Sequence, residues 1–298
     1  MHRPHSSGFA AAWREFVICG LRLRAAGRFV RVPSLVPGRF VLSYLPLLNY
    51  TDVSMSEVDE LVHDAGRHPY LIRVLNSTAC DPEPNHPVAA RLALAGHDEE
   101  HILTRVIKPA CRRKLKQAWR ADYTVEEADD SVLALRLHRF LADTLQRRHG
   151  IPALPAHLFA ALADHAAIDA RFIMLSLQGR PVAGMVLILD GGLAWVPWMA
   201  ADPAAFAQSP NHLLYWRAIA AARASGCDIL DFGRSPYASP TWRFKSQWGC
   251  TPVPIALLAP TPIRIYEKYG WATRVWRHLP ATVARPAGGW LTRHLADL

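Results

Sequence analysis

Apolar and polar positions in the second half of the chain follow the pattern of a sheet built from short antiparallel strands. Three apolar runs, at residues 172–177, 182–189 and 193–199, are separated by turns that contain glycine. Apolar runs of this length joined by such turns are typical of a β-meander. Two further apolar runs predict strands at residues 227–232 and 253–258.

Helices are expected between these strands. Residues 131–149 have a leucine at every fourth position, and Gly150 and Pro152 mark the end of this helix. The other expected helices cover residues 156–165, 209–226 and 240–248, the second of these with Ser209 as N-cap and Pro210 as first residue. The resulting element order predicts a mixed α/β layer with helices on both faces of the sheet.

The first half shows the same kinds of element. Strands are expected at residues 29–32, 40–45, 70–75 and 88–94, and Ser54 with Glu57 forms a capping box for a helix that runs to Ala65. The acidic, polar segment 122–130 marks a boundary. We therefore expect two halves, residues 1–125 and residues 126–298.

Composition identifies a globular protein with an anionic partner. Of the 298 residues, 51% are hydrophobic and 20% are charged, which excludes a disordered chain. The net charge of +9 favours nucleic acid, a phosphorylated substrate or an anionic membrane surface, without choosing among them. Five scattered cysteines without a C-x-x-C indicate reduced thiols and a cytoplasmic location. No segment has the length and composition of a signal peptide or membrane span.

A basic helix is expected from Asp98 to about residue 120, with a break before Pro109. Four cations recur at every fourth position and so share one helical face: Lys108, Arg112, Lys116 and Arg120. Stacked like charges destabilise a helix slightly, and an anionic ligand would relieve this. A solvent-exposed basic face is the alternative, and the sequence leaves both open.

The stretch 231–250 is the strongest candidate site. It follows the predicted strand 227–232 and combines three cations, Arg234, Arg243 and Lys245, with several aromatic rings. A loop of this composition after a buried strand usually carries chemistry, because rigid elements position side chains there. A solvated loop followed by an amphipathic helix is the other interpretation.

Several common active-site motifs are absent. The sequence has no G-x-S-x-G, no P-loop and no G-x-G-x-x-G after a strand. His97 to His101 fits H-x-x-E-H, but His97 precedes the expected cap Asp98, which spoils the geometry of a metal site. An acidic helix N-terminus explains the run better. We expect neither a metal nor a bound cofactor.

These residues carry a family resemblance. The element order of the second half resembles the GNAT acyltransferase fold. The run Asp231 to Ser235, followed by Arg243-Phe244-Lys245 and Trp248-Gly249, resembles the Fem-type peptidyltransferases, tandem-GNAT enzymes that build peptidoglycan bridges, and their relatives in exopolysaccharide and cell-envelope work. The basic helix and Leu45-Pro46-Leu47 with Asn49-Tyr50 resemble further parts of that family.

The resemblance implies an α/β (α+β) fold of tandem GNAT-like domains, with mixed, mostly antiparallel sheets flanked by helices. Thr51 and Asp52 replace the family's usual loop glycines after Tyr50. The N-terminus is shorter than the family's and is expected to lack its first helix and strand, so that either the first half is trimmed or the start of the sequence is misassigned.

The resemblance also implies a reaction, the attack of an amine on an activated acyl or aminoacyl ester. Phe244 and Lys245 inherit the catalytic role, with Lys245 stabilising the oxyanion or clamping the donor. Phe244 and Trp248 would exclude water, and Arg234 and Arg243 would bind a carboxylate or phosphate. Asp231 is either a base for the amine or a buried structural residue. Four more residues complete the predicted substrate site: Tyr50, Ser235, Tyr237 and Trp242.

The donor is expected to be an aminoacyl-tRNA or a related activated acyl group rather than acetyl-CoA. GNAT enzymes hold the coenzyme pyrophosphate on a glycine-rich loop before the helix that follows the fourth strand. Here that segment, residues 200–210, has no glycine, contains two prolines and includes Asp202. The acceptor would be an anionic envelope precursor, reached from the cytoplasm or from the inner membrane face. An acyl-CoA-dependent N-acetyltransferase acting on an envelope sugar, and a non-catalytic module that binds nucleic acid or membrane, are the alternatives.

Overall fold

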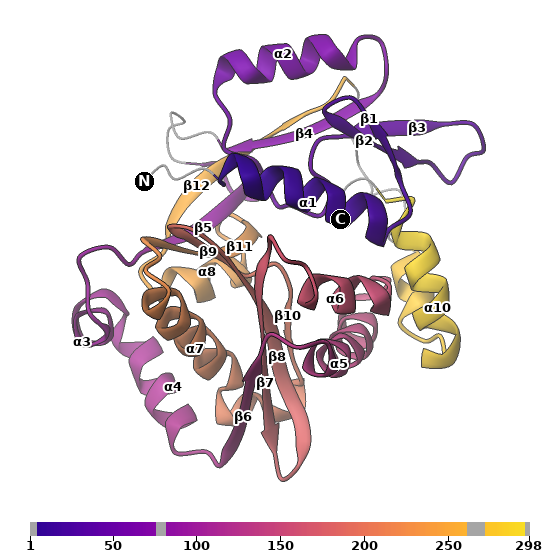
Figure 1. Ribbon diagram of the computed structural model, residues 1–298. Coiled ribbons are helices and arrows are strands. Elements are labelled where there is room, and N and C mark those ends of the chain that lie inside the picture. The colour runs from indigo at the N-terminus through magenta and orange to yellow at the C-terminus, as the bar shows by residue number, and fades with distance from the viewer. Residues whose placement is uncertain (1–4, 76–81, 261–271, 296–298) are drawn as a thin grey trace.

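One long, mostly antiparallel sheet runs through the molecule (Figure 1). The computed structural model describes residues 5–75, 82–260 and 272–295. Along the sheet the strand order is β1-β2-β3-β4-β12-β5-β11-β9-β8-β7-β6, and β10 pairs with β8 beside this path. Among the described strands only the pairs β3–β4 and β9–β11 are parallel. The predicted fold class, a mixed α/β layer of mostly antiparallel strands flanked by helices, is confirmed.

The first half forms one end of this sheet. Its elements are α1 (Ser7–Gly20), β1 (Arg24–Ala26), β2 (Phe29–Pro33), β3 (Phe40–Ser43), α2 (Met55–Ala65) and β4 (Tyr70–Leu75). The predicted capping box is present, because the Ser54 side chain accepts from the Glu57 amide and the Glu57 carboxylate accepts from the Ser54 amide.

The expectation that the first helix and strand are missing is wrong, because α1 and β1 occupy residues 7–26. Helix α1 is anchored by Trp13, which is fully buried and whose Nε1 donates to the Pro46 carbonyl at 3.1 Å. Phe9 and Phe16 stack beside it. This spacing of three and four residues is a helical signal that the arginines around the helix had obscured.

Strands β5 (Pro87–Ala93) and β12 (Thr251–Leu258) join the two halves. β5 lies between β11 and β12 and is antiparallel to both. The second half of β12 continues past β5 and pairs with β4. The sheet is therefore continuous across residue 125, and the division of the chain there stays a prediction.

The segment after β5 is helical, as expected. It consists of α3 (Glu99–His101), a π-helical turn (Ile102–Val106) and α4 (Pro109–Trp119), followed by β6 (Tyr123–Ala128). The Asp98 side chain accepts from the His101 amide at 2.6 Å, which confirms the predicted cap. Ile107 is extended, so the predicted break before Pro109 is also confirmed.

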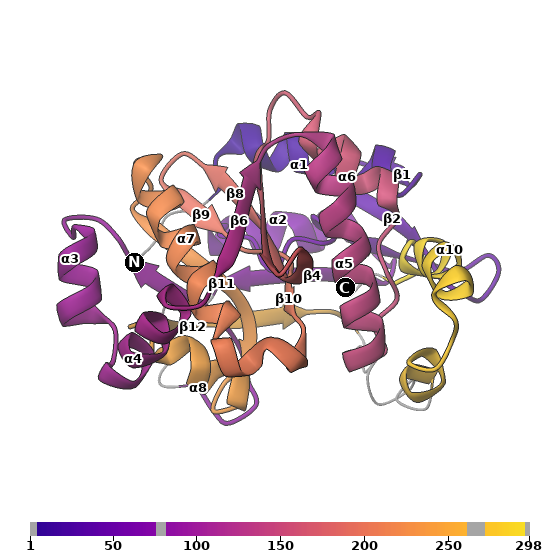
Figure 2. The same ribbon diagram turned by 90° about the horizontal axis from the view of Figure 1, so that it is seen from below.

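The second half has helices on both faces of its sheet. Its elements are α5 (Ser131–His149), α6 (Ala156–Ala163), β7 (Asp169–Leu177), β8 (Arg180–Asp190), β9 (Leu193–Trp195), β10 (Met199–Ala201), a 3-10 turn (Pro203–Gln208), α7 (Pro210–Ala224), β11 (Ile229–Pro236), α8 (Pro240–Ser246) and β12, with α10 (Ala281–Thr292) near the C-terminus. Figures 1 and 2 show α4 and α7 on one face and α5 and α6 on the other. Met185 and Leu187 of β8 belong to the core under α7, whereas Val186 and Ile188 belong to the core under α5, as strand alternation requires.

The predicted third strand of the meander is divided into two, and this division opens the sheet. β9 pairs in parallel with β11 from Leu193 to Trp195, but β10 pairs only with β8. Pro197 lies between β9 and β10, where its missing N–H interrupts the hydrogen-bond ladder. Beyond Asp231, β11 instead continues along β5, so the two neighbouring strands separate.

No helix within the described ranges combines the length and the apolar character that crossing a bilayer requires.

Candidate functional site

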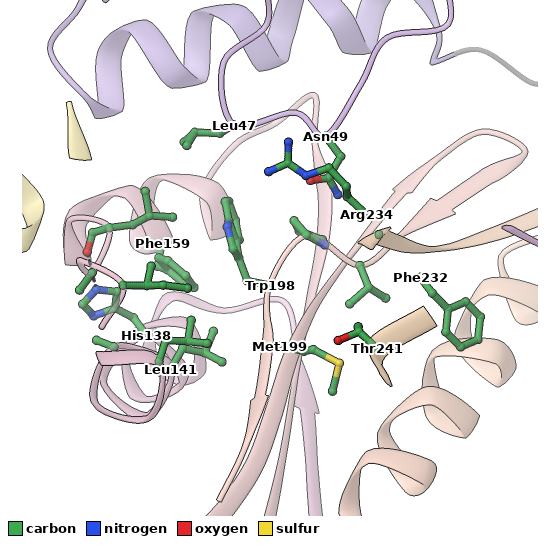
Figure 3. Close-up of a pocket in the computed structure, with 18 of the residues that line it drawn as sticks. Leu47, Asn49, His138, Leu141, Phe159, Trp198, Met199, Phe232, Arg234 and Thr241 are labelled. Atoms are coloured by element: carbon green, nitrogen blue, oxygen red, sulfur yellow. Dashed lines mark hydrogen bonds between the residues drawn. The ribbon is translucent and has the colours of Figure 1, made fainter. Parts of the chain in front are cut away.

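A cavity of about 370 Å³ lies where β9 and β11 separate (Figure 3). Its volume is in the range of small-molecule sites. The lining is mostly apolar on the α5 and α6 side and polar beside β11. The residues that line it are Leu47, Asn49, His138, Leu141, Ala142, Leu145, Ile151, Pro152, Ala153, Leu154, Phe159, Val196, Pro197, Trp198, Met199, Tyr215, Phe232, Gly233, Arg234, Thr241 and Lys245.

Lys245 is the buried cation of this cavity. Its side chain is 5% exposed, and Nζ donates to the carbonyl oxygens of Gly233 at 2.9 Å and Arg234 at 3.1 Å. It projects from α8, whose N-cap Ser239 accepts from the Trp242 amide. An ammonium group has three donors, so these two bonds leave one N–H for a ligand in the cavity.

Gly233 is needed for this arrangement. Its φ of +79° lies in the left-handed region, which favours glycine. A Cβ at this position would lie 3.0 Å from the Val196 carbonyl oxygen and 3.9 Å from Lys245 Nζ. The same residue donates its amide to Asp231 Oδ1 at 2.6 Å. Gly233 thus brings strand β11 close to β9 and connects Asp231 to Lys245.

A buried ionic network lies behind the lysine. Asp231 is fully buried, and its Oδ2 accepts from Arg91 Nε at 3.4 Å. Arg91, 1% exposed, also donates to the Tyr50 hydroxyl from Nε and Nη2, at 3.3 and 3.1 Å, and its Nη1 lies 3.9 Å from Asp52 Oδ2. Buried charges persist when they are paired in this way. The network joins the β3–α2 loop and β5 of the first half to β11 of the second.

Burial controls the ionisation of these groups. Removal from water raises the pKa of Asp231 above its ordinary value, against the hydrogen bond from Gly233 and the charge of Lys245. Burial likewise lowers the pKa of Lys245, against the attraction of Asp231. It also lowers the pKa of Arg91 to about 10, against the attraction of Asp52. The lysine and the aspartate therefore titrate as a pair.

Of the other predicted residues on the stretch 231–250, Arg234 lines the cavity. Figure 3 shows it beside Asn49, above Trp198. Ser235 is buried, Trp242 is buried against the ring of Tyr237 at 5.5 Å, and Arg243 is exposed on α8. These four residues do not line the cavity.

Phe244 and Trp248 were expected to wall Lys245 from water, and neither lines the cavity. Both rings approach Tyr215 of α7, at 5.7 and 6.0 Å. The reason is helical phase, because Thr241 and Lys245 are one turn apart and face the cavity, whereas residues 244 and 248 share the neighbouring face. The rings that do line the cavity are Phe159, Trp198, Tyr215 and Phe232.

Tyr50 and Asp231 are both present at the site but lie beneath its surface. Tyr50 is 2% exposed and holds Arg91 through its hydroxyl. Asp231 does not line the cavity. It pairs with Arg91 at 3.4 Å and acts on Lys245 through its charge and through Gly233, which both residues hold. A direct role of Asp231 as a base for an incoming amine stays a prediction without geometric support.

The basic residues of α4 lie apart from the cavity, and none of them lines it. Lys108, Lys116 and Arg120 are exposed, whereas Arg112 donates to the Thr104 carbonyl at 2.8 Å and so also stabilises the preceding turn. Helix α4 packs on α7, on the face of the sheet opposite α5 (Figure 2). Binding of an anion there stays a prediction.

Sequence reasoning missed Asn49, His138, Thr241 and Arg91 as parts of the site. Arg91 carried a signal, since a lone cation within the apolar run 88–94 requires a buried partner. Thr241 could have been found from its spacing of four residues before Lys245 on a helix. Asn49 lies in the run Leu45 to Tyr50 that carries part of the family resemblance, so that run was its signal, whereas for His138 no local pattern existed.

In the segment between β10 and α7, several backbone amides donate hydrogen bonds to acceptors within the same segment. The Ala204 amide donates to Asp202 Oδ1, the Ala205 amide to the Asp202 carbonyl, and the Ser209 amide to the Phe206 carbonyl. The His212 amide donates to the Ser209 carbonyl, and Pro210 has no N–H. None of these donors is therefore directed at a ligand phosphate.

Residues 106–246 match the family model of the acetyltransferase (GNAT) domain. The chain thus carries a GNAT domain, and the cavity, Lys245 and the separating strands all lie within or beside it. No curated protein matches the sequence.

Three solved structures share the fold over most of their length. One is FemX, with a TM-score of 0.56 and 14% identity, covering 90% of this chain and 94% of that chain. Another is the C-terminal domain of a protein from Agrobacterium fabrum assigned as a lysylphosphatidylglycerol synthetase, with a TM-score of 0.55, 12% identity and coverage of 88% and 89%. The third is L-PGS from Bacillus licheniformis, with a TM-score of 0.52, 13% identity and coverage of 94% and 99%.

At these identities the similarity establishes the fold alone. It confirms the Fem-type resemblance at the level of architecture: this chain has a GNAT acyltransferase fold similar to those of FemX and the lysylphosphatidylglycerol synthetases. The match of residues 106–246 to the acetyltransferase (GNAT) domain supports a transferase.

Proposed function

We propose that this protein transfers an aminoacyl or other activated acyl group onto an amine of a cell-envelope precursor related to peptidoglycan or exopolysaccharide. One observation carries the proposal. The buried ammonium group of Lys245 is fixed by the Gly233 and Arg234 carbonyls at the polar end of the cavity, with one N–H left for a ligand. A fixed cation in such a setting stabilises a developing negative charge far better than water does.

The reaction follows from this geometry. The acceptor amine attacks the ester carbonyl, a C–N bond forms, and the carbonyl oxygen becomes an oxyanion near Lys245. The C–O bond to the donor then breaks, and the departing oxygen takes the proton that the amine loses. The apolar side chains of α5, α6 and Trp198 exclude water, which would otherwise hydrolyse the ester.

An aminoacyl-tRNA or related donor is supported by two features. In the segment 202–212 the amides of Ala204, Ala205, Ser209 and His212 bond within the chain, the two prolines have no N–H, and Asp202 adds a negative charge, so the segment is poorly suited to a coenzyme pyrophosphate. The exposed cations of α4 and the net charge of +9 suit a polyanionic donor. One of the similar structures is also named as the C-terminal domain of a lysylphosphatidylglycerol synthetase, which is consistent with such a donor.

An acyl-CoA-dependent N-acetyltransferase acting on an envelope sugar is the second candidate. It is favoured by the match of residues 106–246 to the acetyltransferase (GNAT) domain. Both candidates place the reaction in the cytoplasm or at the inner membrane face.

A donor screen tests the proposal. Purified protein is incubated with an envelope-precursor pool and either a mixture of charged tRNAs or a mixture of acyl-CoA esters, and products are detected by mass spectrometry. A mass increase of one amino-acid residue with charged tRNA supports the proposal. An acyl increment that appears only with acyl-CoA supports the second candidate instead, and turnover with neither donor contradicts both.

A further inference from the structure

A second cavity, of about 580 Å³, lies on the outer side of α5. Four segments that are distant in sequence surround it: the end of α1, the middle of α5, the start of α6 and helix α10. Figures 1 and 2 show α10 beside α5 at the edge of the molecule.

Specific contacts fix the wall of the cavity, because they hold α10 and the segment before it on α5. Gln146 Nε2 donates to the carbonyls of Trp276 at 3.0 Å and Leu279 at 2.8 Å. Arg285 makes a bidentate pair with Asp143, at 2.8 and 2.6 Å. A Cβ at Gly288 would lie 2.7 Å from the Ala153 amide nitrogen, so helix and loop are in close contact.

The lining of this cavity is basic. Four arginines from three segments line it, Arg22, Arg139, Arg285 and Arg293, and no carboxylate is among the described lining residues. Because Asp143 balances the charge of Arg285, the cations that need an anion are Arg22, Arg139 and Arg293. The Arg293 guanidinium donates to the Arg22 carbonyl at 3.3 Å, while its buried Nε has no hydrogen-bond partner within the described ranges. Cations gathered in this way repel one another, and an anion between them would relieve the repulsion.

Exposed apolar side chains flank the arginines on both helices. Trp290 is 57% and Leu135 42% exposed, and both line the cavity. Val283, two helical turns before Trp290, and Val132, one turn before Leu135, are 51% and 68% exposed. A basic recess with an apolar rim that includes tryptophan is typical of a surface that meets the head groups and upper acyl chains of a bilayer.

We propose that this cavity binds the phosphate group of an anionic lipid, with the exposed side chains of α5 and α10 inserted between neighbouring lipids. Arg22, Arg139 and Arg293 supply the charge complement to the phosphate, whereas Arg285 is held by Asp143, and Trp290 with Leu135 contacts the acyl region. His138 borders this cavity and the cavity of Lys245, so a lipid bound here lies directly behind the reaction site. The proposal does not depend on which acyl group the protein transfers.

Vesicle sedimentation tests the proposal with full-length protein. We expect binding to vesicles that contain 30% phosphatidylglycerol in phosphatidylcholine, and little binding to phosphatidylcholine alone. The double variant Arg139→Gln/Arg293→Gln should bind about 25-fold more weakly, at roughly fivefold for each cation near an anionic surface. The control variant Arg67→Gln/Arg180→Gln removes the same charge from exposed sites outside the cavity and should bind like the wild type.

Two further arms identify the source of the phosphate and guard against a folding defect. Trp290→Ala leaves every arginine in place and should also weaken vesicle binding, with unchanged thermal unfolding. Glycerol 3-phosphate and an unacylated RNA are tested as alternative ligands of the same cavity. The lipid assignment would be overturned if both double variants weakened vesicle binding equally, or if the wild type bound neutral vesicles as well as anionic ones. It would also be overturned if Arg139→Gln/Arg293→Gln lost binding of glycerol 3-phosphate or RNA but kept its binding to vesicles.

Discussion

Asp231 and Lys245 hold the same residue from opposite ends: Asp231 Oδ1 accepts the amide of Gly233 at 2.6 Å, and Lys245 Nζ donates to its carbonyl at 2.9 Å. The two charges are thereby linked through one residue of β11, by its amide on one side and its carbonyl on the other. Because Arg91 holds the other oxygen of Asp231, at 3.4 Å, the lysine is fixed by a network that reaches β5. The predictions below follow from this unit and from the surfaces around it.

Lys245→Met should reduce the rate of transfer by about 10²–10³, the usual effect of losing one oxyanion-stabilising group. Methionine has a similar length and suits a buried site, so the protein should still unfold in one cooperative transition. Single-turnover rates and thermal melting measure the two effects. Arg180→Met, on an exposed turn, is the control. Near-normal turnover of Lys245→Met would exclude a catalytic role for the lysine.

Gly233→Ala should damage both stability and transfer. Any side chain at φ +79° is strained by about 1–2 kcal/mol, and a Cβ here also meets the Val196 carbonyl at 3.0 Å. Gly179 is a matched control, because its φ is +74° and a Cβ there has no atom within 4 Å. Urea unfolding should show the strain in both variants, with the larger loss for Gly233→Ala. Transfer should fall in Gly233→Ala alone, and equal behaviour of the two variants contradicts this prediction.

The pH dependence of transfer should reveal the coupled pair. Burial lowers the pKa of Lys245, so the charged form is lost, and the rate falls, as the pH rises through a value below the ordinary lysine pKa of 10.5. Asp231→Asn removes an attraction that raises this pKa, so the alkaline limb should move to lower pH. The exposed Asp164→Asn should leave it in place. A limb that does not move in Asp231→Asn would show that the carboxylate does not act on the lysine.

Acid stability should depend on His212. Burial, with a contribution from Lys114, lowers the pKa of this histidine to about 4, and its ring packs edge-on against Phe244 at 5.2 Å. Between an unfolded pKa of about 6.5 and the folded value, the unfolded state binds the extra proton, so stability falls as the pH is lowered through this window.

Unfolding of His212→Phe in urea should therefore show a smaller loss of stability between pH 7 and pH 5 than the wild type. His63→Phe, at an exposed position of α2, is the control for the substitution itself. An unchanged loss in His212→Phe would mean that other groups determine the acid sensitivity.

The elements that sequence predicted well are those with local causes. Ser54 with Glu57, Asp98, and Gly150 in the left-handed conformation act on residues three or four positions away, and all three do what their patterns indicate. Lys245 and Arg234 lie at the cavity for a similar local reason, since the apolar strand before them leads directly to it, and their role in a site stays a prediction.

The sequence could not predict contacts between residues that are far apart along the chain. Arg91 and Asp231 are 140 residues apart, and Tyr50 reaches Arg91 across 41 residues. The break between β9 and β10 depends on which strands pair on either side of Pro197, which one chain segment does not reveal. Phe244 and Trp248 were expected beside Lys245 only because they are aromatic residues near it in the sequence. The direction of each side chain depends instead on its position around the helix and the following turn, and both rings point toward Tyr215.

The basic face of α4 should bind the phosphates of a charged tRNA. Lys108 and Lys116 are exposed on this face, and neither makes an ion pair with a carboxylate in the part of the chain that the structure describes. Each phosphate contact releases condensed counterions, so log K falls by about 0.7–0.9 per contact for each unit of log salt. The variant Lys108→Gln/Lys116→Gln should therefore bind charged tRNA more weakly and show a slope smaller by about 1.4–1.8.

Filter binding across a range of potassium chloride concentrations measures this slope, and Arg67→Gln/Arg180→Gln again removes equal charge elsewhere. Arg112 is left intact because its guanidinium holds the Thr104 carbonyl, so its loss would confuse binding with folding. Calorimetry of the wild type with acetyl-CoA separates the two donors, because it measures coenzyme binding directly. The variants do not make this distinction, since Gln117 of α4 bonds to Ala207 and Ser209 and α4 therefore lies beside the segment 202–212. If the slope is unchanged while acetyl-CoA binds at micromolar concentration, α4 is a solvated face and the acyl-CoA donor is the correct one.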